Sequence, residues 1–305
     1  MNLAQLRALR AVHEAGSVTG AADLLGVTQS AVSHALTSLE NELGMRLVIR
    51  ERSGCCLTEV GRRLMPHVVG ALHHVERFAE EAAAASGLLD GRVRIGAFPS
   101  ACRVLPRFVR AFRKLHPAVD VVLLEGTDAE VEEWIGTGVI DLGVVSGPRP
   151  DLRTVPLAAD EFLAVLPSAH PLAAERAVGL ADLSDDPFLL SAAGCEPLIR
   201  AHYRAVGLDL SPAHRVQRMD TLLAMVREDL GVSVVPSLAL PELLDGIRAI
   251  PLRPPAPRSL LLAAPADTEP TPAARAFLDA VTVQPPAPPP SRPPVPARAT
   301  PVPVP

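Results

Sequence analysis

Apolar residues near the start of the chain recur at the spacing of amphipathic helices, and each run ends near a glycine. The first run begins at Leu3 and is stopped by Gly16-Ser17. Two further helices are predicted, over residues 19–25 and from residue 29 to about residue 42. The short turn between them contains Thr28, which is suited to cap the third helix. This arrangement is typical of a helix-turn-helix.

The segment after the third helix predicts a wing. Residues 47–50 and 56–57 are typical of two short strands, and Ser53-Gly54 supplies the turn between them. Residues 1–60 are therefore expected to form a winged helix-turn-helix domain, which is the all-α-rich part of the molecule.

The third predicted helix has an apolar face and a polar face. Its apolar residues step by four, three and four from Val32 to Leu43. In a helix-turn-helix the second helix of the motif enters the major groove of DNA, where base edges can be distinguished. We therefore expect this helix, with the arginines beside the wing, to contact DNA through Gln29, Ser30, Ser33, His34, Thr37, Arg50 and Arg52.

A long helix is predicted from Thr58 to about Ser86, and residues 61–88 are expected to be a linker and dimerisation helix. Pro66 is expected to kink its early turns, and His73-His74 to face solvent. Its apolar residues alternate steps of four and three, as in a helix that packs on a partner helix: Leu64, Val68, Ala71, Val75, Phe78, Ala82 and Ala85. The seam favours a dimer over packing on the same chain alone, because nothing nearby would otherwise cover it.

After a hinge-like break at 87–91, short apolar strands alternate with helices, as in a doubly wound parallel sheet. Strands are predicted at 93–97, 119–125, 141–146, 162–166, 188–191, 214–218, 232–235 and 260–264. Helices are predicted at 100–116, 128–136, 196–206, 220–230 and 272–281. A proline-rich tail, residues 284–305, follows and is expected to be disordered.

Composition excludes some classes of protein. The formal net charge is −5, and acidic residues offset the arginines within residues 1–60, so charge gives no sign of nucleic-acid binding. No apolar stretch is long enough for a transmembrane helix, and the first helix carries charges that a signal peptide would lack. A cytoplasmic protein without a membrane partner is therefore expected.

Motifs of enzymes and of cofactor sites do not occur in the sequence. It contains no P-loop, GxSxG, HExxH or dinucleotide fingerprint. Its cysteines form no CxxC pair and no metal-ligand spacing, and are expected to be reduced thiols: Cys55, Cys56, Cys102 and Cys195. We expect no catalytic activity, no metal and no cofactor.

The run LRALRAVHEAGSVTGAADLLGVTQSAVSHALTSLENELGMRLVIR, followed by LTEVGRRL, closely resembles the DNA-binding region of LysR-type transcriptional regulators. The segments RVRIGAFPS, DLGVVSGP, HPLA and REDLGVSVVP resemble landmarks of the effector-binding domain of the same family. The resemblance covers the chain except its proline-rich tail. It implies a DNA-binding transcription regulator that assembles as a homodimer or homotetramer and responds to a small-molecule effector.

The resemblance also implies an α/β effector domain of two lobes, similar to type 2 periplasmic binding proteins. Lobe one would comprise residues 91–161 and 265–283, and lobe two residues 162–264. The chain would cross between the lobes near Glu161-Phe162 and near Ala264-Pro265.

Ligands of open parallel sheets bind beyond the carboxyl ends of the strands. The first strand ends at Phe98-Pro99, and Ser100 is placed to cap the next helix, whose amino terminus suits an anion. The family resemblance puts Ser100 and Ala101 at positions that contact the effector. The expected effector-binding residues are Ser100, Ala101, Cys102, Thr127, Ser146, Ser191 and Cys195, and no arginine is placed to act as an anchor.

Two alternatives stay open at this point. One is a repressor that acts without a ligand. The other is a thiol-based redox sensor, since Cys102 and Cys195 are expected across the same cleft and a thiol near a helix amino terminus ionises more readily. The resemblance indicates a small organic acid or an amino-acid-like molecule as effector, with double-stranded DNA and RNA polymerase as candidate macromolecular partners.

Overall fold

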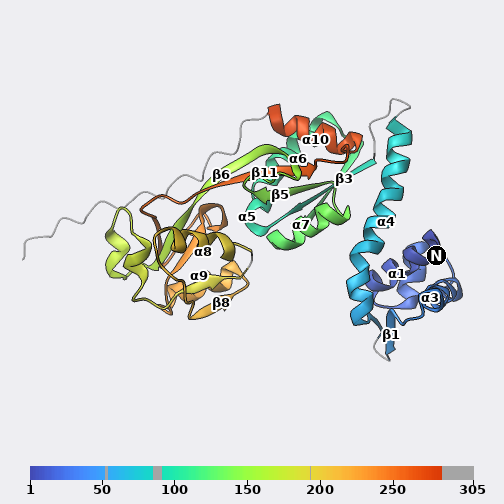
Figure 1. Ribbon diagram of the computed structural model, residues 1–305, viewed down its shortest axis with the longest axis horizontal. Helices are drawn as coiled ribbons and strands as arrows, with labels where there is room; N and C mark the ends of the chain where they lie inside the picture. Colours follow the sequence, from blue (N-terminus) through green and yellow to red (C-terminus); the bar gives the residue numbers. More distant parts are fainter. Residues whose placement is uncertain (52–53, 85–90, 193, 284–305) are drawn as a thin grey trace, which may run out of the picture.

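We analysed a computed structural model of the chain, which describes residues 1–51, 54–84, 91–192 and 194–283. Arg52, Ser53, Ala85, the break before Gly91 and the tail 284–305 lie outside the described residues, so the predictions made for them stay predictions. Within the described part, a winged helix, a long helix and two α/β lobes follow one another (Figure 1). No helix there combines the length and apolar character needed to cross a membrane.

The winged helix forms as predicted, from α1 (Leu3–Ala15), α2 (Val18–Leu25), α3 (Gln29–Leu43), β1 (Val48–Glu51) and β2 (Gly54–Leu57). Side-chain oxygens of Asn2, Ser17 and Thr28 cap the three helix starts. Gly16, Gly26 and Gly44 end the helices in the left-handed conformation that glycine adopts at little cost.

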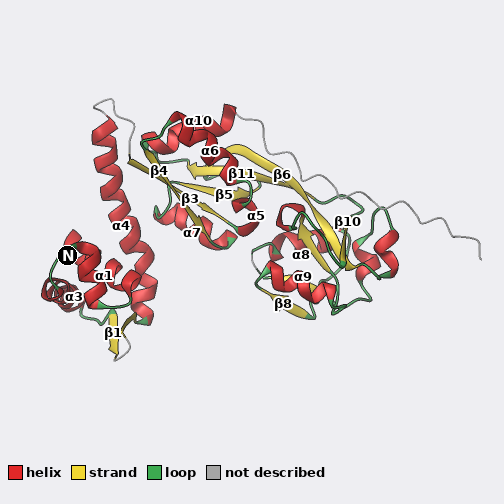
Figure 2. Ribbon diagram, turned by 180° about the vertical axis from the view of Figure 1, so that it is seen from behind, coloured by secondary structure: helices red, strands yellow, loops and turns green. Residues whose placement is uncertain are grey.

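Helix α4 (Glu59–Ala84) lies beside the winged helix along its first turns and beside lobe one along its later turns (Figures 1 and 2). Met65, Val68 and Leu72 join the core of the winged helix, and Leu64 packs against it. The prediction that nothing on the same chain covers the seam is therefore wrong for Leu64 and Val68. It holds at Phe78, whose side chain is 78% exposed.

The structure also corrects the solvent exposure predicted for His73-His74. His74 is exposed, whereas His73 is 2% exposed and hydrogen bonded to Asp141. The two residues differ because successive positions of a helix point in different directions, and His73 faces lobe one.

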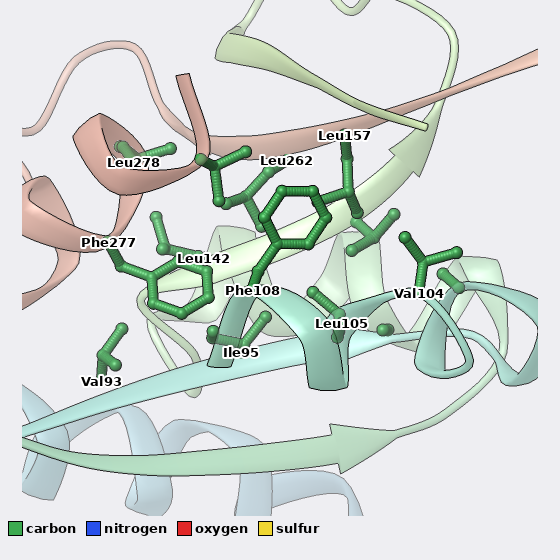
Figure 3. Close-up of a cluster of buried hydrophobic side chains, with 14 of the residues drawn as sticks. Val93, Ile95, Val104, Leu105, Phe108, Leu142, Leu157, Leu262, Phe277 and Leu278 are labelled. Carbon is green, nitrogen blue, oxygen red and sulfur yellow. The ribbon is translucent and has the colours of Figure 1, made fainter. Parts of the chain in front are cut away.

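Lobe one contains β3 (Gly91–Ala97), β4 (Val119–Glu125), β5 (Leu142–Ser146), part of β6 (Leu152–Pro167) and β11 (Pro257–Pro265). Helices α5 (Pro99–Cys102), α6 (Leu105–Leu115), α7 (Asp128–Thr137) and α10 (Pro272–Val283) accompany the sheet. Figure 3 shows its core, where Phe108 of α6 and Phe277 of α10 pack over Ile95, Leu142 and Leu262 of the strands.

Within the described residues, seven strands form the main sheet in the order β10-β6-β11-β5-β3-β4, with β9 paired to β6. Strands β3, β4 and β5 are parallel, but β6 and β11 run antiparallel to their neighbours. The sheet is thus mixed, not wholly parallel as predicted, because β11 runs between β5 and β6 in the direction opposite to both.

Lobe two is built on the far half of β6, with β9 (Ser233–Pro236) and β10 (Ile247–Pro251) beside it. A small parallel pair, β7 (Leu189–Ser191) and β8 (His214–Val216), lies near α8 (Glu196–Ala205) and α9 (Met219–Arg227). Short 3₁₀ turns complete the lobe: η1 (Pro171–Ala174), η2 (Leu180–Leu183) and η3 (Ser237–Ala239).

Strand β6 passes between the lobes without interruption at Glu161-Phe162. The second crossing was predicted at Ala264-Pro265, and the structure corrects it. Leu260 and Leu262 belong to the core of lobe one, and β11 pairs with β5 there, so the chain re-enters lobe one near Pro257.

Two further elements differ from the predictions. The helix predicted over 100–116 is divided into α5 and α6, since Pro99 and Pro106 each occupy the first turn of a helix, where proline is favoured. Strand β10 was not predicted, because Arg248 and the flanking prolines obscure its apolar pattern.

Candidate DNA-binding surface and interlobe cleft

The predicted DNA-contacting residues of α3 lie on one surface. Gln29, Ser30, His34 and Thr37 are exposed, and Ser33 is half-buried. On the opposite side of the helix, Val32, Leu36 and Leu39 are each 1% exposed within the domain core. The hydroxyls of Thr28 and Ser30 are 3.0 Å apart, so Ser30 lies beside the helix cap.

Glu40 holds the wing against α3. Its buried carboxylate accepts hydrogen bonds from the backbone of Leu47 at 2.8 Å and of Val48 at 3.1 Å, and from Arg46 at 3.0 Å. The Cys55 amide donates to the carbonyl of Gly16 at 2.7 Å, which fixes β2 to the end of α1. Arg50 is exposed on β1 of the wing.

Arg258 lies at the crossing between the lobes, and sequence reasoning missed it. Its guanidinium donates to the carboxylate of Asp160 at 2.7 and 2.9 Å, and to Ser100 Oγ at 3.1 Å. The ion pair is almost fully buried, with side-chain exposures of 3% and 0%. Cys195 Sγ of lobe two lies 3.8 Å from Arg258 Nη1, so the arginine joins both lobes.

Asp160 and Arg258 occupy paired positions of β6 and β11. Each lies just outside a strand predicted from the sequence, at 162–166 and at 260–264, so no local pattern marked the two as partners. Only the pairing of the two strands shows that each buried charge has the partner it requires. Arg258 is held by Asp160 and does not line the cavities described below, so it does not contradict the prediction that no arginine is placed as an effector anchor.

Ser100 was predicted to cap the helix that follows β3. The structure shows that it does not. Phe98 is the capping residue of α5 and makes no side-chain hydrogen bond, while Pro99 begins the helix. The hydroxyl of Ser100 instead accepts the hydrogen bond from Arg258. Ser100 is thus tied to the crossing strands.

A cavity of about 330 Å³ opens between the lobes and is lined by Ser100, Ser191 and Cys195, among others. A second cavity, of about 700 Å³, is lined by Thr127, Asp128, Ser146 and Gly194. The structure thus places most of the expected effector-binding residues along the cleft. Ala101 and Cys102 line neither cavity; Ala101 belongs to the lobe-one core, and Cys102 packs against it.

Two residues that line the larger cavity each carry a polar atom without a partner. Asp128 Oδ2 and Ser146 Oγ are buried, and neither has a hydrogen-bond partner among the described residues. Burial raises the pKa of the Asp128 carboxyl, and the charge of Arg258 opposes that rise. Gly194 of lobe two closes against Asp128 so tightly that a Cβ atom there would lie 2.0 Å from Asp128 Oδ2. A ligand could donate a hydrogen bond to this buried acceptor only if Gly194 moved away from it.

The thiols of the cleft are hard to ionise. Burial raises the pKa of the Cys195 thiol to about 11. Burial and the neighbouring Glu125 raise the pKa of Cys102 to about 11 as well. Both shifts are opposite to the lowered pKa that a helix amino terminus alone would produce.

Comparison with known families matches nearly the whole described chain. Residues 3–62 match the bacterial regulatory helix-turn-helix protein family of the lysR type, and residues 86–284 match the LysR substrate binding domain. The uncharacterized HTH-type transcriptional regulator YvbU of Bacillus subtilis is 34% identical over 283 residues, which cover 92% of this chain and 97% of that protein.

Solved structures share the same fold. Full-length CbnR complexed with its target DNA superposes with a TM-score of 0.66 at 23% identity, over 92% of this chain and 99% of that chain. A full-length OxyR variant from Pseudomonas aeruginosa, in which a cysteine is replaced by aspartate, gives a TM-score of 0.65 at 23% identity, over 93% and 98% of the two chains. From the two family matches and the relative that spans the chain, this protein belongs to the LysR family of DNA-binding transcriptional regulators, with a winged helix-turn-helix and a two-lobed effector-binding domain.

Proposed function

We propose that α3 reads operator DNA in the major groove through its exposed polar side. Gln29 suits bidentate pairing with adenine, and His34 is placed to donate to guanine or phosphate. Ser30, Ser33 and Thr37 extend the same surface, and Arg50 and Arg52 of the wing approach the backbone or minor groove. The exposure of Gln29, Ser30, His34, Thr37 and Arg50, with a buried apolar face on the other side of α3, supports this assignment.

His34→Ala tests the DNA contact. We expect weaker operator binding in a gel-shift titration, by about tenfold, which corresponds to about 1.4 kcal/mol. His214→Ala is the matched control, because His214 is exposed on β8 of lobe two. Equal affinities of the two variants, with unchanged assembly and melting temperature, would remove His34 from the contact surface.

We propose that the cleft between the lobes binds the effector. The observation that carries this proposal is the pair of buried polar atoms without partners, Asp128 Oδ2 and Ser146 Oγ, at the wall of a cavity of about 700 Å³. The same cavity is lined by Arg149, Arg200 and Arg204. An amino-acid-like molecule fits this lining, with its ammonium towards Asp128 and its carboxylate towards the arginines.

A thermal-shift screen of metabolites on the full-length protein tests the cleft. Ligands of the folded state raise its melting temperature by mass action. We expect donor-bearing compounds to stabilise the wild type, and to lose this effect in a Ser146→Ala variant that lacks one side chain of the wall. Stabilisation that survives in that variant, and in Asp128→Asn, would place the ligand elsewhere.

We further propose that the protein acts in the cytoplasm as a homodimer or homotetramer without catalytic activity. The exposed Phe78 on α4 supports a helix–helix contact with a second copy. Linked copies gain affinity for paired half-sites without new contacts. RNA polymerase is the partner we propose for the DNA-bound assembly.

A further inference from the structure

Helix α4 is seated on lobe one by close packing. Val69 contacts the apolar cluster that α7 and β5 form, and Gly70 faces the end of α7. A Cβ atom at Gly70 would lie 2.2 Å from the Thr137 carbonyl oxygen, so the two backbones approach as closely as a glycine permits. We call this contact of α4 with lobe one, at Gly70, the seat of α4. It is specific to one position of the helix, because only glycine fits there.

A buried hydrogen-bond network centres on His73. Arg94 Nη1 donates to His73 Nδ1 at 2.7 Å, and His73 Nε2 lies 3.0 Å from Asp141 Oδ1. Because arginine can only donate, Nδ1 must accept, and the imidazole hydrogen therefore sits on Nε2 and points at Asp141. The second oxygen of Asp141 accepts from the Arg94 amide at 2.8 Å. This arrangement fixes the ring between α4 and lobe one.

The network continues to the winged helix. Arg94 also pairs with Glu76 of α4, and the other oxygen of Glu76 lies 3.7 Å from Arg10 of α1. Ionic contacts therefore run from β3 of lobe one, through α4, to the first helix of the DNA-binding domain.

The elements that hold α4 also reach the cleft. Helix α7 begins at Asp128 in the cleft and ends at Thr137 under Gly70. Strand β5 follows Asp141 and ends at Ser146 in the cleft. The two elements pack as one body, because Ile135 and Val131 of α7 lie directly on Gly143 of β5. With ten residues and a rise of about 1.5 Å each, α7 spans about 15 Å.

We propose that α7 and β5 act as one coupling body between the cleft and the DNA-binding domain. A ligand that engages Asp128 and Ser146 moves this body, and the body moves the seat of α4 at Gly70 and His73. This inference rests on the proposed effector site and names the path of its regulation. The coupling is reciprocal, because two sites linked through one equilibrium influence each other equally. DNA binding must therefore alter the cleft.

Hydrogen-exchange mass spectrometry on the full-length protein tests this reciprocity without knowledge of the effector. The probe is an operator fragment recovered by genome-wide mapping of binding sites. In the wild type we expect DNA to change amide exchange at residues 127–131 and 142–147 by about fivefold or more, the lower range of allosteric coupling. In His73→Leu and in Arg94→Met the fragment should still bind, but exchange at the cleft should not respond.

His67→Leu is the matched control, because His67 is exposed on the same helix and lies away from the network. It should keep the wild-type response. Arg94→Met leaves the side chains of His73 and Asp141 in place. It therefore tests the network even if His73→Leu fails to fold. An unchanged cleft in DNA-bound wild type, or a full response in both network variants, would overturn the coupling. An effector site that fails the thermal-shift test, with a cleft that still responds to DNA, would refute the proposed ligand site and leave the coupling intact.

Discussion

Arg258 and Asp160 form the most buried ion pair among the described residues, at the point where the chain crosses between the lobes. Leu238 donates a backbone hydrogen bond to Asp160 at 3.1 Å, and the rings of Phe98 and Phe162 lie 5.5 and 5.6 Å from the guanidinium carbon. The guanidinium is thus enclosed by one charge and two aromatic faces. These contacts compensate for removing both charges from water.

Removing only the arginine should be costly. Arg258→Met leaves the Asp160 carboxylate buried without its partner, and we expect a loss of about 3–5 kcal/mol in the free energy of unfolding, measured by urea denaturation. The double variant Arg258→Met/Asp160→Asn should recover a large part of it. Arg153→Met, which breaks an exposed pair with Glu269, should cost less than about 1 kcal/mol. Equal losses in Arg258→Met and Arg153→Met would contradict the role of the buried pair.

Asp128 should reduce stability at neutral pH. Burial raises its pKa above the ordinary value of 3.8. Its contribution to stability is therefore fullest below that value and is lost as pH rises through the raised pKa. Asp128→Asn lacks this loss, so at pH 7 its melting temperature should exceed that of the wild type by about 2–4 °C, the effect of about 1 kcal/mol in a domain of this size.

Asp279→Asn, an exposed change on α10, is the control and should leave the melting temperature unchanged. A higher stability that accompanies a weaker ligand response would mark Asp128 as a residue retained for binding. A wild type more stable than Asp128→Asn at pH 7 would contradict the uncompensated carboxylate.

The thiols of the cleft should react slowly. A pKa of about 11 for Cys102 and Cys195, against an ordinary 9.0, lowers the thiolate fraction about a hundredfold at neutral pH. Alkylation followed by mass spectrometry should label the exposed Cys56 well before either of them. After mild oxidation both should remain unlinked. A Cys102–Cys195 disulfide under those conditions would favour the redox alternative. The likeness to OxyR does not decide this question, because it concerns the fold alone.

At the scale of elements, prediction from sequence worked where local signals agree. Thr28 and Gly44 mark the ends of α3, and the apolar spacing between them gives its buried face. Prediction from sequence failed where the position of a strand depends on pairing with residues far away in the chain. Strand β11 belongs to lobe one because it pairs with β5 and β6, which no local pattern records. The division of α5 from α6 was not predicted. It follows from Pro99 and Pro106, because proline is favoured in the first turn of a helix.

Helix α4 gives a prediction about assembly. Phe78 is 78% exposed on the seam, so a second copy of the helix has apolar surface to cover there. Phe78→Glu should reduce the assembled mass by half in sedimentation velocity at micromolar concentration. Leu243→Glu is the control, because Leu243 is 81% exposed in lobe two. Equal masses for both variants and the wild type would contradict a contact through this seam.

At the scale of the whole molecule, the candidate site was predicted in part. The positions of Thr127, Ser146 and Ser191 followed from strand ends, since ligands of such sheets bind there. Arg258, Asp128 and His73 did not follow, because each owes its role to residues far away in the chain. Asp128 faces Gly194, and His73 faces Asp141. Such contacts arise only when the lobes and α4 are assembled.

The central claim is that a ligand between the lobes alters how the paired winged helices bind DNA. The most direct measurement is the operator affinity of the full-length protein, by titration with footprinting, without ligand and with a saturating ligand from the thermal-shift screen. We predict a change in the operator Kd of about 5–150-fold, or a change in the length of the footprint, because the ligand must favour one arrangement over the other. The same Kd and the same footprint in both conditions would contradict the account.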